Sequence, residues 1–195
     1  MKRIITVSRE FGSGGRSIGK AVAQKLGINY YDKEIIEKIA EKTGLSKDFI
    51  AQNGEYARGK NLFSYAFLGR TMEGKSVEDY IWEAQRNIIL DLAEKESCVI
   101  VGRCADYILA DRSDCLNVFI HADEEFKKDR IVRIYGETGE KPEKRLQDKD
   151  KKRSVNYKYY TDRQWGLAGN YHLCLDSSEF GIDKCVEVIA DLSAL

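Results

Sequence analysis

A glycine-rich bend near the start of the chain constrains the fold more than any other feature. The stretch ITVSREFGSGGRSIGKAVAQKLG, residues 5–27, runs from an apolar segment through this bend into a segment with helical periodicity. Small residues allow backbone N–H groups to converge on phosphate oxygens, and a helix that starts there adds the positive end of its dipole. The stretch therefore predicts a phosphate-binding loop between a first strand and a first helix.

Two of three interpretations of the bend do not involve the P-loop pattern. The dinucleotide fingerprint G-x-G-x-x-G fits Gly12 and Gly14 but finds Ser17 where the third glycine should stand. Asp32, after the next strand-like run, lies about where that fingerprint expects a ribose-binding carboxylate. The other interpretation is a tight turn that holds no ligand.

The third interpretation, which the residues favour, is a variant of the P-loop pattern G-x-x-x-x-G-K-[ST]. With Gly15 as the second glycine, Arg16 takes the lysine position, Ser17 the hydroxyl position and Glu10 the first glycine position. Arginine also binds phosphate, with a planar fork, and Ser17 could ligate Mg²⁺. Glu10 must be turned away or paired, for instance with Arg9. The backbone groups expected to hold donor phosphates are those of Gly12, Ser13, Gly14 and Gly15.

The rest of the chain alternates apolar runs with helical periodicity, which predicts one α/β domain over residues 1–195. Mostly apolar runs without strict alternation are typical of strands buried on both faces of a parallel sheet. We expect a three-layer sandwich with a five-stranded parallel sheet and a ligand at the carboxyl ends of the strands. Strands are expected at residues 4–8, 28–32, 98–101, 116–121 and 171–175, and helices at 16–26, 33–42, 77–96, 123–135 and 182–192.

Two segments fit this alternation less well. Residues 33–97 form a helical insert that includes LFSYAFLGR, residues 62–70, which could be core, a dimer contact or a wall of an acceptor pocket. Residues 136–169 are dominated by charge, which is typical of a solvated helix. Arginines and tyrosines within this segment favour a basic lid instead: Arg145, Arg153, Arg163, Tyr157, Tyr159 and Tyr160.

Composition excludes several classes of function. Among 195 residues, 43% are apolar and 33% are charged with a formal net charge of zero, so no basic excess points to nucleic acid. No apolar run is long enough for a membrane span, and the N-terminus does not resemble a signal peptide. Five widely spaced cysteines without a C-x-x-C pair predict a reducing cytoplasmic location and no zinc site. A monomer and a homodimer both remain open.

The sequence resembles the cytidylate kinase-like family, whose members are P-loop relatives of nucleoside monophosphate kinases. The resemblance is carried by SREFGSGG, which includes arginine in place of lysine, and then by VIVGRCADYIL, NVFIHA, RIVRIYG and YHLCLDSS in order along nearly the whole chain. It implies a P-loop fold with a helical lid at 136–169. It also implies transfer of the γ-phosphoryl group of ATP, with Mg²⁺, to a monophosphate acceptor.

The resemblance also implies roles for individual residues. Arg103, in the "GR" that follows the strand at 98–101, would hold the acceptor phosphate, although a surface pair with Asp106 is the alternative. Asp32 would lie on the acceptor side, unless it only caps the next helix. Arg153, and less clearly Arg145 or Arg163, would reach in from the lid. The catalytic candidates are thus Arg16, Arg103 and Arg153. The candidates for binding ATP are the residues of the loop and Arg130. The candidates for binding the acceptor are Asp32, Arg103, Asp106 and Arg163.

This chain departs from the family pattern at the acceptor side. Cys104 stands where cytidylate kinases follow "GR" with an aspartate that helps to read cytosine, YYDKEII replaces the expected DTGAMYR, and no aspartate closes the third strand. The leading hypothesis is a kinase for CMP, dCMP or a related monophosphate. The alternatives are a kinase for another small molecule, a non-catalytic nucleotide-binding module and, last, a dinucleotide-dependent oxidoreductase.

Overall fold

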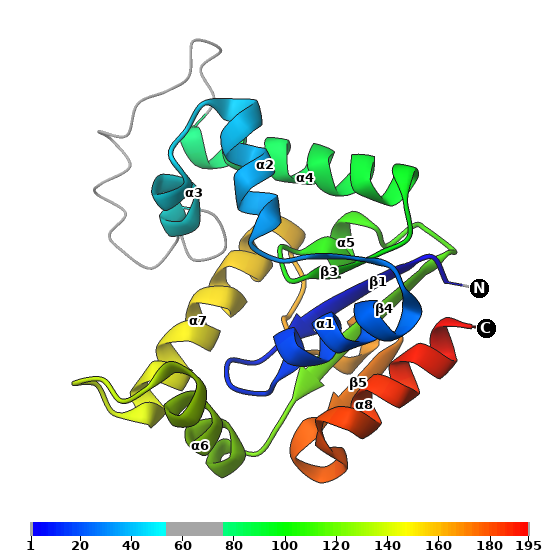
Figure 1. The fold of residues 1–195 in the computed structure, drawn as a ribbon. Helices are drawn as coiled ribbons and strands as arrows, with labels where there is room; N and C mark the ends of the chain where they lie inside the picture. The colour runs from blue at the N-terminus through cyan, green and yellow to red at the C-terminus, as the bar shows by residue number, and fades with distance from the viewer. Residues whose placement is uncertain (1, 54–75, 195) are drawn as a thin grey trace.

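The computed structural model describes residues 2–53 and 76–194, and in these ranges the chain forms one sheet with helices around it (Figure 1). The segment at residues 62–70 lies outside the described residues. Among the described residues, all pairs of neighbouring strands are parallel, in the order β2-β3-β1-β4-β5. The strands are β1 (Ile4–Arg9), β2 (Asn29–Tyr31), β3 (Cys98–Val101), β4 (Cys115–His121) and β5 (Leu173–Asp176).

The position of β1 fixes where a ligand can bind. Ile4 of β1 lies opposite Cys98 of β3 on one side and opposite Cys115 of β4 on the other, so β1 is the central strand. Because its neighbours run parallel to it, the carboxyl ends of all three strands lie at one edge of the sheet. Ligands of open α/β sheets bind at this edge. The predicted five-stranded parallel sheet is confirmed.

Helices cover both faces of the sheet (Figure 1), which confirms the three-layer sandwich. Successive residues of a strand point to opposite faces, and β1 uses this alternation. Ile5 packs on one face in a core cluster with residues of two helices, whereas Ile4 packs on the other face in a second cluster. The first face carries α1 (Gly15–Leu26) and α8 (Ser177–Ser193); the second carries α2 (Glu34–Thr43), α3 (Lys47–Asn53), α4 (Val77–Lys95) and α5 (Ala105–Ile108).

The remaining helices lie beyond the carboxyl edge of the sheet (Figure 1). They are α6 (Glu124–Tyr135) and α7 (Pro142–Thr161). A short 3-10 helix, η2 (Ala168–Asn170), directly precedes β5. A purely solvated helix at residues 136–169 is excluded, because α7 buries several side chains, three of them polar or charged. The buried residues are Leu146, Arg153, Asn156, Tyr157 and Thr161. Within the described ranges, no helix is both long and apolar enough to cross a membrane.

Sequence patterns misplaced some boundaries. β5 starts at Leu173 instead of residue 171, because Tyr171 still closes η2 with its backbone N–H. α8 includes a short helical turn before the predicted helix, because the Asp176 side chain accepts hydrogen bonds from the backbone N–H groups of Ser178 and Glu179. Gly181, with a non-helical φ of 75°, separates this turn from residues 182–193. The two short helices α3 and α5 were not predicted, since four to seven residues show too little periodicity.

The central strand offers a stability test. Ile5 is fully buried, whereas Ile134 at the end of α6 is 57% exposed. We expect Ile5→Ala to lower the free energy of unfolding by about 2–5 kcal/mol, since it removes buried methyl groups and leaves a cavity. The matched variant Ile134→Ala should change it by less than about 0.5 kcal/mol. Urea unfolding measures both values, and equal losses would contradict the assigned core.

Candidate active site

The glycine-rich bend connects the last residue of β1 to the first turn of α1. Gly12 and Gly14 have φ values of 86° and 85°, a region that glycine enters far more readily than other residues. Space is also restricted, because a Cβ on Gly14 would lie 2.5 Å from Cδ1 of Ile182. Both glycines are therefore required by the backbone path that turns the chain into α1.

The first turn of α1 leaves backbone donors open. Gly14 is the N-cap residue, and no side chain caps the helix. The N–H groups of Gly14, Gly15 and Ser17 have no hydrogen-bond acceptor in the part of the chain that the structure describes. A helix start whose amides have no acceptor can bind an anion, because the N–H groups donate hydrogen bonds to it and the positive end of the helix dipole attracts it.

These amides border a hollow of about 400 Å³ that is open to solvent. Its walls come from the bend, from α6 and from α7. The lining residues are Arg9, Glu10, Phe11, Gly12, Gly14, Gly15, Arg16, Ser17, Arg130, Ile134, Tyr135 and Arg153.

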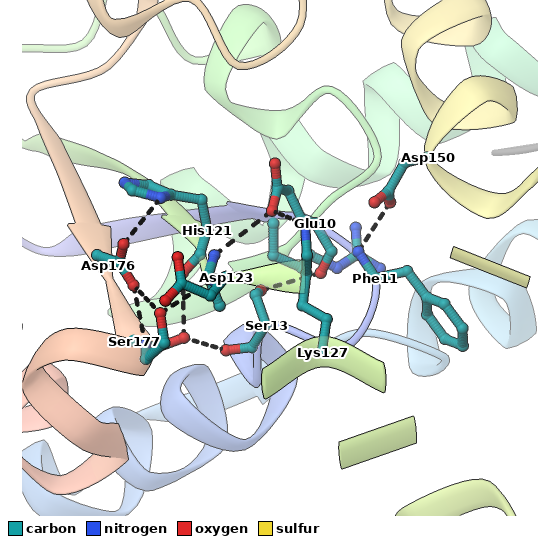
Figure 2. Close-up of polar contacts among 12 residues, drawn as sticks. Glu10, Phe11, Ser13, His121, Asp123, Lys127, Asp150, Asp176 and Ser177 are labelled. Atoms are coloured by element: carbon teal, nitrogen blue, oxygen red, sulfur yellow. Dashed lines mark hydrogen bonds and ion pairs between the residues drawn. The ribbon is translucent and has the colours of Figure 1, made fainter. Parts of the chain in front are cut away.

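The bend is anchored from behind by three helices, as Figure 2 shows. From α8, Ser177 donates to the carbonyl of Ser13 at 2.5 Å. From α6, Lys127 Nζ lies 2.6 Å from a carboxylate oxygen of Glu10. From α7, Asp150 accepts from the backbone N–H of Phe11 at 2.7 Å. Glu10 lines the hollow, but its carboxylate is paired with Lys127, and the suggested pairing of Glu10 with Arg9 is wrong.

Ser13 takes a different position from the one its sequence context suggested. It is fully buried, its hydroxyl donates to the carbonyl of Glu10 at 2.9 Å, and its own N–H points to the same oxygen at 3.4 Å. It does not line the hollow. Ser13 thus stabilises the bend from within, while the neighbouring glycines face the open side.

Two further candidates on α1 have protein partners. Arg16 forms an ion pair with Asp32, with 2.9 Å between Nε and Oδ2, and its side chain is 36% exposed. The Ser17 hydroxyl accepts a hydrogen bond of 2.7 Å from Nη2 of Arg130. Arg16, Ser17 and Arg130 all line the hollow, whereas Asp32 lies behind Arg16 at the end of β2.

A second hollow of about 270 Å³ adjoins the first, since Arg9 and Arg153 line both. Three arginines meet here with almost no exposed surface: Arg9 is 4%, Arg103 is 5% and Arg153 is 6% exposed. Nη1 of Arg153 donates to the carbonyl of Arg9 and to Asp150. The other lining residues are Ser8, Gly102, Cys104, Asn156, Tyr157 and Trp165.

Arg103 has buried donors that no protein group satisfies. Its Nε and Nη1 atoms are fully buried and lack a hydrogen-bond partner throughout residues 2–53 and 76–194. The backbone that presents it is strained, since Gly102, Arg103 and Cys104 all have positive φ, at 72°, 59° and 54°. Such strain costs about 1–3 kcal/mol per non-glycine residue and tends to occur at functional sites. Gln85 fixes the segment by donating to the Arg103 carbonyl at 3.0 Å.

Asp106 does not pair with Arg103. It is 2% exposed and accepts hydrogen bonds from Ser8 at 3.2 Å and from Tyr157 at 2.6 Å. Burial raises the pKa of Asp106, although both hydrogen bonds oppose the rise. Burial and the Asp106 charge raise the pKa of Tyr157. Arg163 lies over the ring of Tyr107 at 5.1 Å and lines neither hollow.

The structure thus brings together most but not all of the predicted residues. The bend, Arg16, Ser17, Arg103, Arg130 and Arg153 surround the two hollows, while Ser13, Asp32, Asp106 and Arg163 lie behind their walls. Sequence reasoning missed residues that reach the site from distant elements. For Arg9, the position at the end of a predicted strand was the signal that could have identified it. The missed residues are Lys127, Asp150, Asn156 and Trp165, while Arg9 was considered only as a partner of Glu10.

Chemically, the site suits a polyanion. The amides at the start of α1 can donate hydrogen bonds to phosphate oxygens. The three buried guanidinium groups can donate charged, bidentate hydrogen bonds to the same kind of oxygen. The donor set for a metal ion is small, since no group of three or more His, Cys, Asp or Glu side chains that could hold one occurs in the described ranges. The site therefore favours phosphate groups over a metal held by protein side chains.

Comparison with known proteins agrees with this geometry. Residues 4–179 match the cytidylate kinase-like family. A curated relative from Archaeoglobus fulgidus, named cytidylate kinase, is 28% identical over 191 residues, which cover 95% of this chain and 91% of the relative.

Solved structures of similar fold include a protein from Eubacterium ventriosum, with a TM-score of 0.74, 27% identity and 98% of each chain covered. Shikimate kinase from Bacteroides thetaiotaomicron has a TM-score of 0.57 at 18% identity, again with 98% of each chain covered. Shikimate kinase from Acinetobacter baumannii, solved with shikimate, has a TM-score of 0.55 at 18% identity and covers 97% of this chain and 91% of its own. The last two show the P-loop kinase fold alone.

Asp106 gives the site a testable pH dependence. The unfolded pKa of aspartate is about 3.9, and burial raises the folded value, so the folded state keeps its proton where the unfolded state has lost it. The stability that Asp106 contributes is complete below about pH 4 and is lost as pH rises through the folded pKa. We expect the free energy of unfolding, wild type minus Asp106→Asn, to fall with rising pH by at most about 1.4 kcal/mol per unit.

Urea unfolding between pH 4 and pH 8 measures this difference. Tyr157→Phe removes a hydrogen bond that lowers the pKa of Asp106, so in that variant the fall should move to higher pH. A difference that stays flat or rises with pH would contradict the buried position of Asp106.

Proposed function

The chain belongs to the cytidylate kinase-like family and is a phosphotransferase, and we propose that it transfers the γ-phosphoryl group of ATP to a nucleoside monophosphate. CMP and dCMP are the first candidates for the acceptor, since a relative over nearly the whole chain is named cytidylate kinase. One observation carries the proposal. Two nitrogen atoms of the buried Arg103 guanidinium have no partner among the described residues, and they lie in a hollow that adjoins the open amides of α1.

We assign the donor phosphates to the hollow at the start of α1. The N–H groups of Gly14, Gly15 and Ser17 are open donors at the positive end of the helix dipole. Arg130 reaches this hollow from α6, close enough to donate to Ser17. A polyphosphate there would replace the Arg130–Ser17 contact with charged hydrogen bonds, which are about twice as strong as neutral ones.

The acceptor phosphate is assigned to the second hollow. Leaving a charged donor buried without a partner costs at least about 1–3 kcal/mol, and an acceptor phosphate would remove that cost by accepting from Nε and Nη1 of Arg103. The strained backbone from Gly102 to Cys104 holds this side chain inward. Asn156 adds to the same hollow a buried side-chain oxygen that has no donor in the described part of the chain, which suits an acceptor that carries a hydroxyl or amino group.

The reaction then needs positioning more than covalent help from the protein. An oxygen of the acceptor phosphate attacks Pγ of ATP, the bond from Pγ to the β–γ bridging oxygen breaks, and ADP leaves with its electron pair. The acceptor oxygen is largely deprotonated at neutral pH, so no protein base is required. Arg153 lines both hollows, and we assign it to the equatorial oxygens, where charge accumulates during transfer.

Magnesium fits this site only as an ion that arrives with the nucleotide. Ser17 contributes one hydroxyl, and Mg²⁺ commonly combines one or two protein ligands with phosphate oxygens and several waters. When bound, the ion would neutralise charge on the β- and γ-phosphates. Ser17 can serve as the protein ligand once Arg130 has turned to the phosphates.

The remaining assignments concern the chain as a whole. We propose that residues 136–169 act as the lid, since α7 supplies Arg153 and Asn156 to the second hollow. Residues 33–97 would form the acceptor-side insert of a single kinase domain. A cytoplasmic location is favoured by five cysteines that are all free.

An acceptor screen tests the proposed function. ADP release from ATP is measured with CMP, dCMP, UMP, AMP and shikimate, and we expect CMP or dCMP to give the highest kcat/KM. Turnover with shikimate alone would favour a kinase for another small molecule. Binding of ATP in a thermal-shift assay without turnover of any acceptor would favour a nucleotide-binding module. A shift with NAD and none with ATP would overturn the proposal.

Substitution of Arg103 distinguishes binding of the acceptor from binding of ATP in the same assay. We expect Arg103→Met to raise the acceptor KM roughly 10- to 100-fold, because a hydrogen bond to a charged group contributes about 1.5–3 kcal/mol. The KM for ATP should change little. Arg103→Lys should restore part of the loss, and Arg3→Met, a partly exposed arginine at the start of the chain, is the matched control. Equal changes in both KM values would count against the assignment.

A further inference from the structure

The start of α1 favours a different register of the P-loop pattern from the one read in the sequence. Gly14 is the residue with positive φ that caps α1, and the helix starts at Gly15. In the pattern G-x-x-x-x-G-K-[ST], the second glycine stands directly before the lysine. With Gly14 in that place, the first glycine position is occupied by Arg9 and the lysine position by Gly15.

Arg9 fills the space that a side chain at position 15 would need. A Cβ built on Gly15 would lie 2.4 Å from Cβ and 2.9 Å from Cγ of Arg9, closer than real atoms approach. The side chain of Arg9 therefore passes over the first turn of α1. A residue larger than glycine at position 15 and an arginine at position 9 exclude each other.

Arg9 also lies where both phosphate groups of the proposed reaction would meet. It is the last residue of β1, it is 4% exposed, and it lines both hollows. Nη1 of Arg153 donates to its carbonyl at 3.2 Å, which ties the two arginines together. Arg16, the residue at the lysine position in the sequence-based register, instead forms an ion pair with Asp32 and is 36% exposed.

We propose that Arg9 supplies the phosphate-binding cation that lysine supplies in the P-loop pattern, and that cation and glycine have exchanged positions 9 and 15. The guanidinium approaches from the strand instead of from the helix. Its planar fork can donate to two oxygens at once, whereas a lysine acts as a point charge. Arg9 thereby contacts the β- and γ-phosphates directly. This inference rests on the proposed kinase function, which it deepens.

Reversing the exchange tests the proposal. Arg9→Gly removes the cation and should lower kcat/KM for ATP by about 100-fold or more, the loss typical of a transition-state donor. Gly15→Lys alone should also be impaired, because its Cβ would clash with Arg9. The double variant Arg9→Gly/Gly15→Lys restores both glycines and the lysine of the ordinary pattern, although Arg16 still stands at its hydroxyl position, so it should exceed Arg9→Gly by at least about 10-fold. If the two substitutions acted independently, their fold-losses in kcat/KM would multiply. A double variant with a lower kcat/KM than either single variant would therefore overturn the proposal.

A second set of variants tests the proposal even if the variants above fail to fold. Arg9→Lys and Arg9→Met nearly preserve side-chain length, and circular dichroism confirms their fold. We expect Arg9→Met to weaken binding of a non-hydrolysable ATP analogue at least about 10-fold in calorimetry, Arg9→Lys to recover part of it, and Arg16→Met to lose less. A larger loss for Arg16→Met, or an Arg9→Met value within about threefold of wild type, would overturn the assignment to Arg9.

The same experiments separate this inference from the proposed function. Wild-type protein that neither binds the analogue nor turns over any acceptor would overturn both. Wild-type turnover that survives in Arg9→Met would leave the kinase function in place and overturn only the role of Arg9.

Discussion

Positive charge buried at the carboxyl edge of the sheet is the constraint on which the site depends. Arg9, Arg103 and Arg153 are each at most 6% exposed, and removing a charged group from water costs several kcal/mol unless it is paired and hydrogen-bonded. Because β1 and β3 run parallel, the residues that follow them end at the same edge. The topology thus brings two of these charges together, and within the described residues no protein group accepts from Nε and Nη1 of Arg103.

The helix α7 couples the parts of the site to one another. It contacts β1 through Arg153, the glycine-rich bend through Asp150, and the start of α5 through Tyr157. Burial raises the pKa of Asp150, while the nearby Arg153 charge and the Phe11 N–H oppose the rise. One helix therefore supports the bend and completes the wall of the second hollow. A change in the position of α7 would alter both hollows at once.

The sequence predicted the parts of the fold that local patterns encode. Apolar runs located all five strands of the described sheet within a few residues, and helical periodicity located α1, α2, α4 and α6. The sequence also indicates the glycine-rich bend and Arg103. Short helices such as α3 escaped, because their periodicity covers less than two turns.

Contacts between residues far apart in the sequence limited how much of the site could be predicted. Lys127 and Asp150 lie more than 100 residues from the bend that they anchor, and nothing in their local sequence marks them. The register of the bend depends on which glycine takes positive φ and caps the helix, and Gly14 and Gly15 are equally plausible by sequence. Arg9 was overlooked for this reason, since a register that starts at Glu10 leaves it outside the pattern.

The acceptor side departs from the family pattern in one further physical respect. Cys104 occupies the position of the base-reading aspartate and is held in a left-handed conformation at φ 54°. The nearest carboxylate, Asp106, cannot replace that aspartate in this arrangement, because Ser8 and Tyr157 use its oxygens and it lies behind the wall of the hollow. If the proposed function holds, recognition of an acceptor base falls to groups other than this carboxylate, and its phosphate binds to the arginines that the strand ends position.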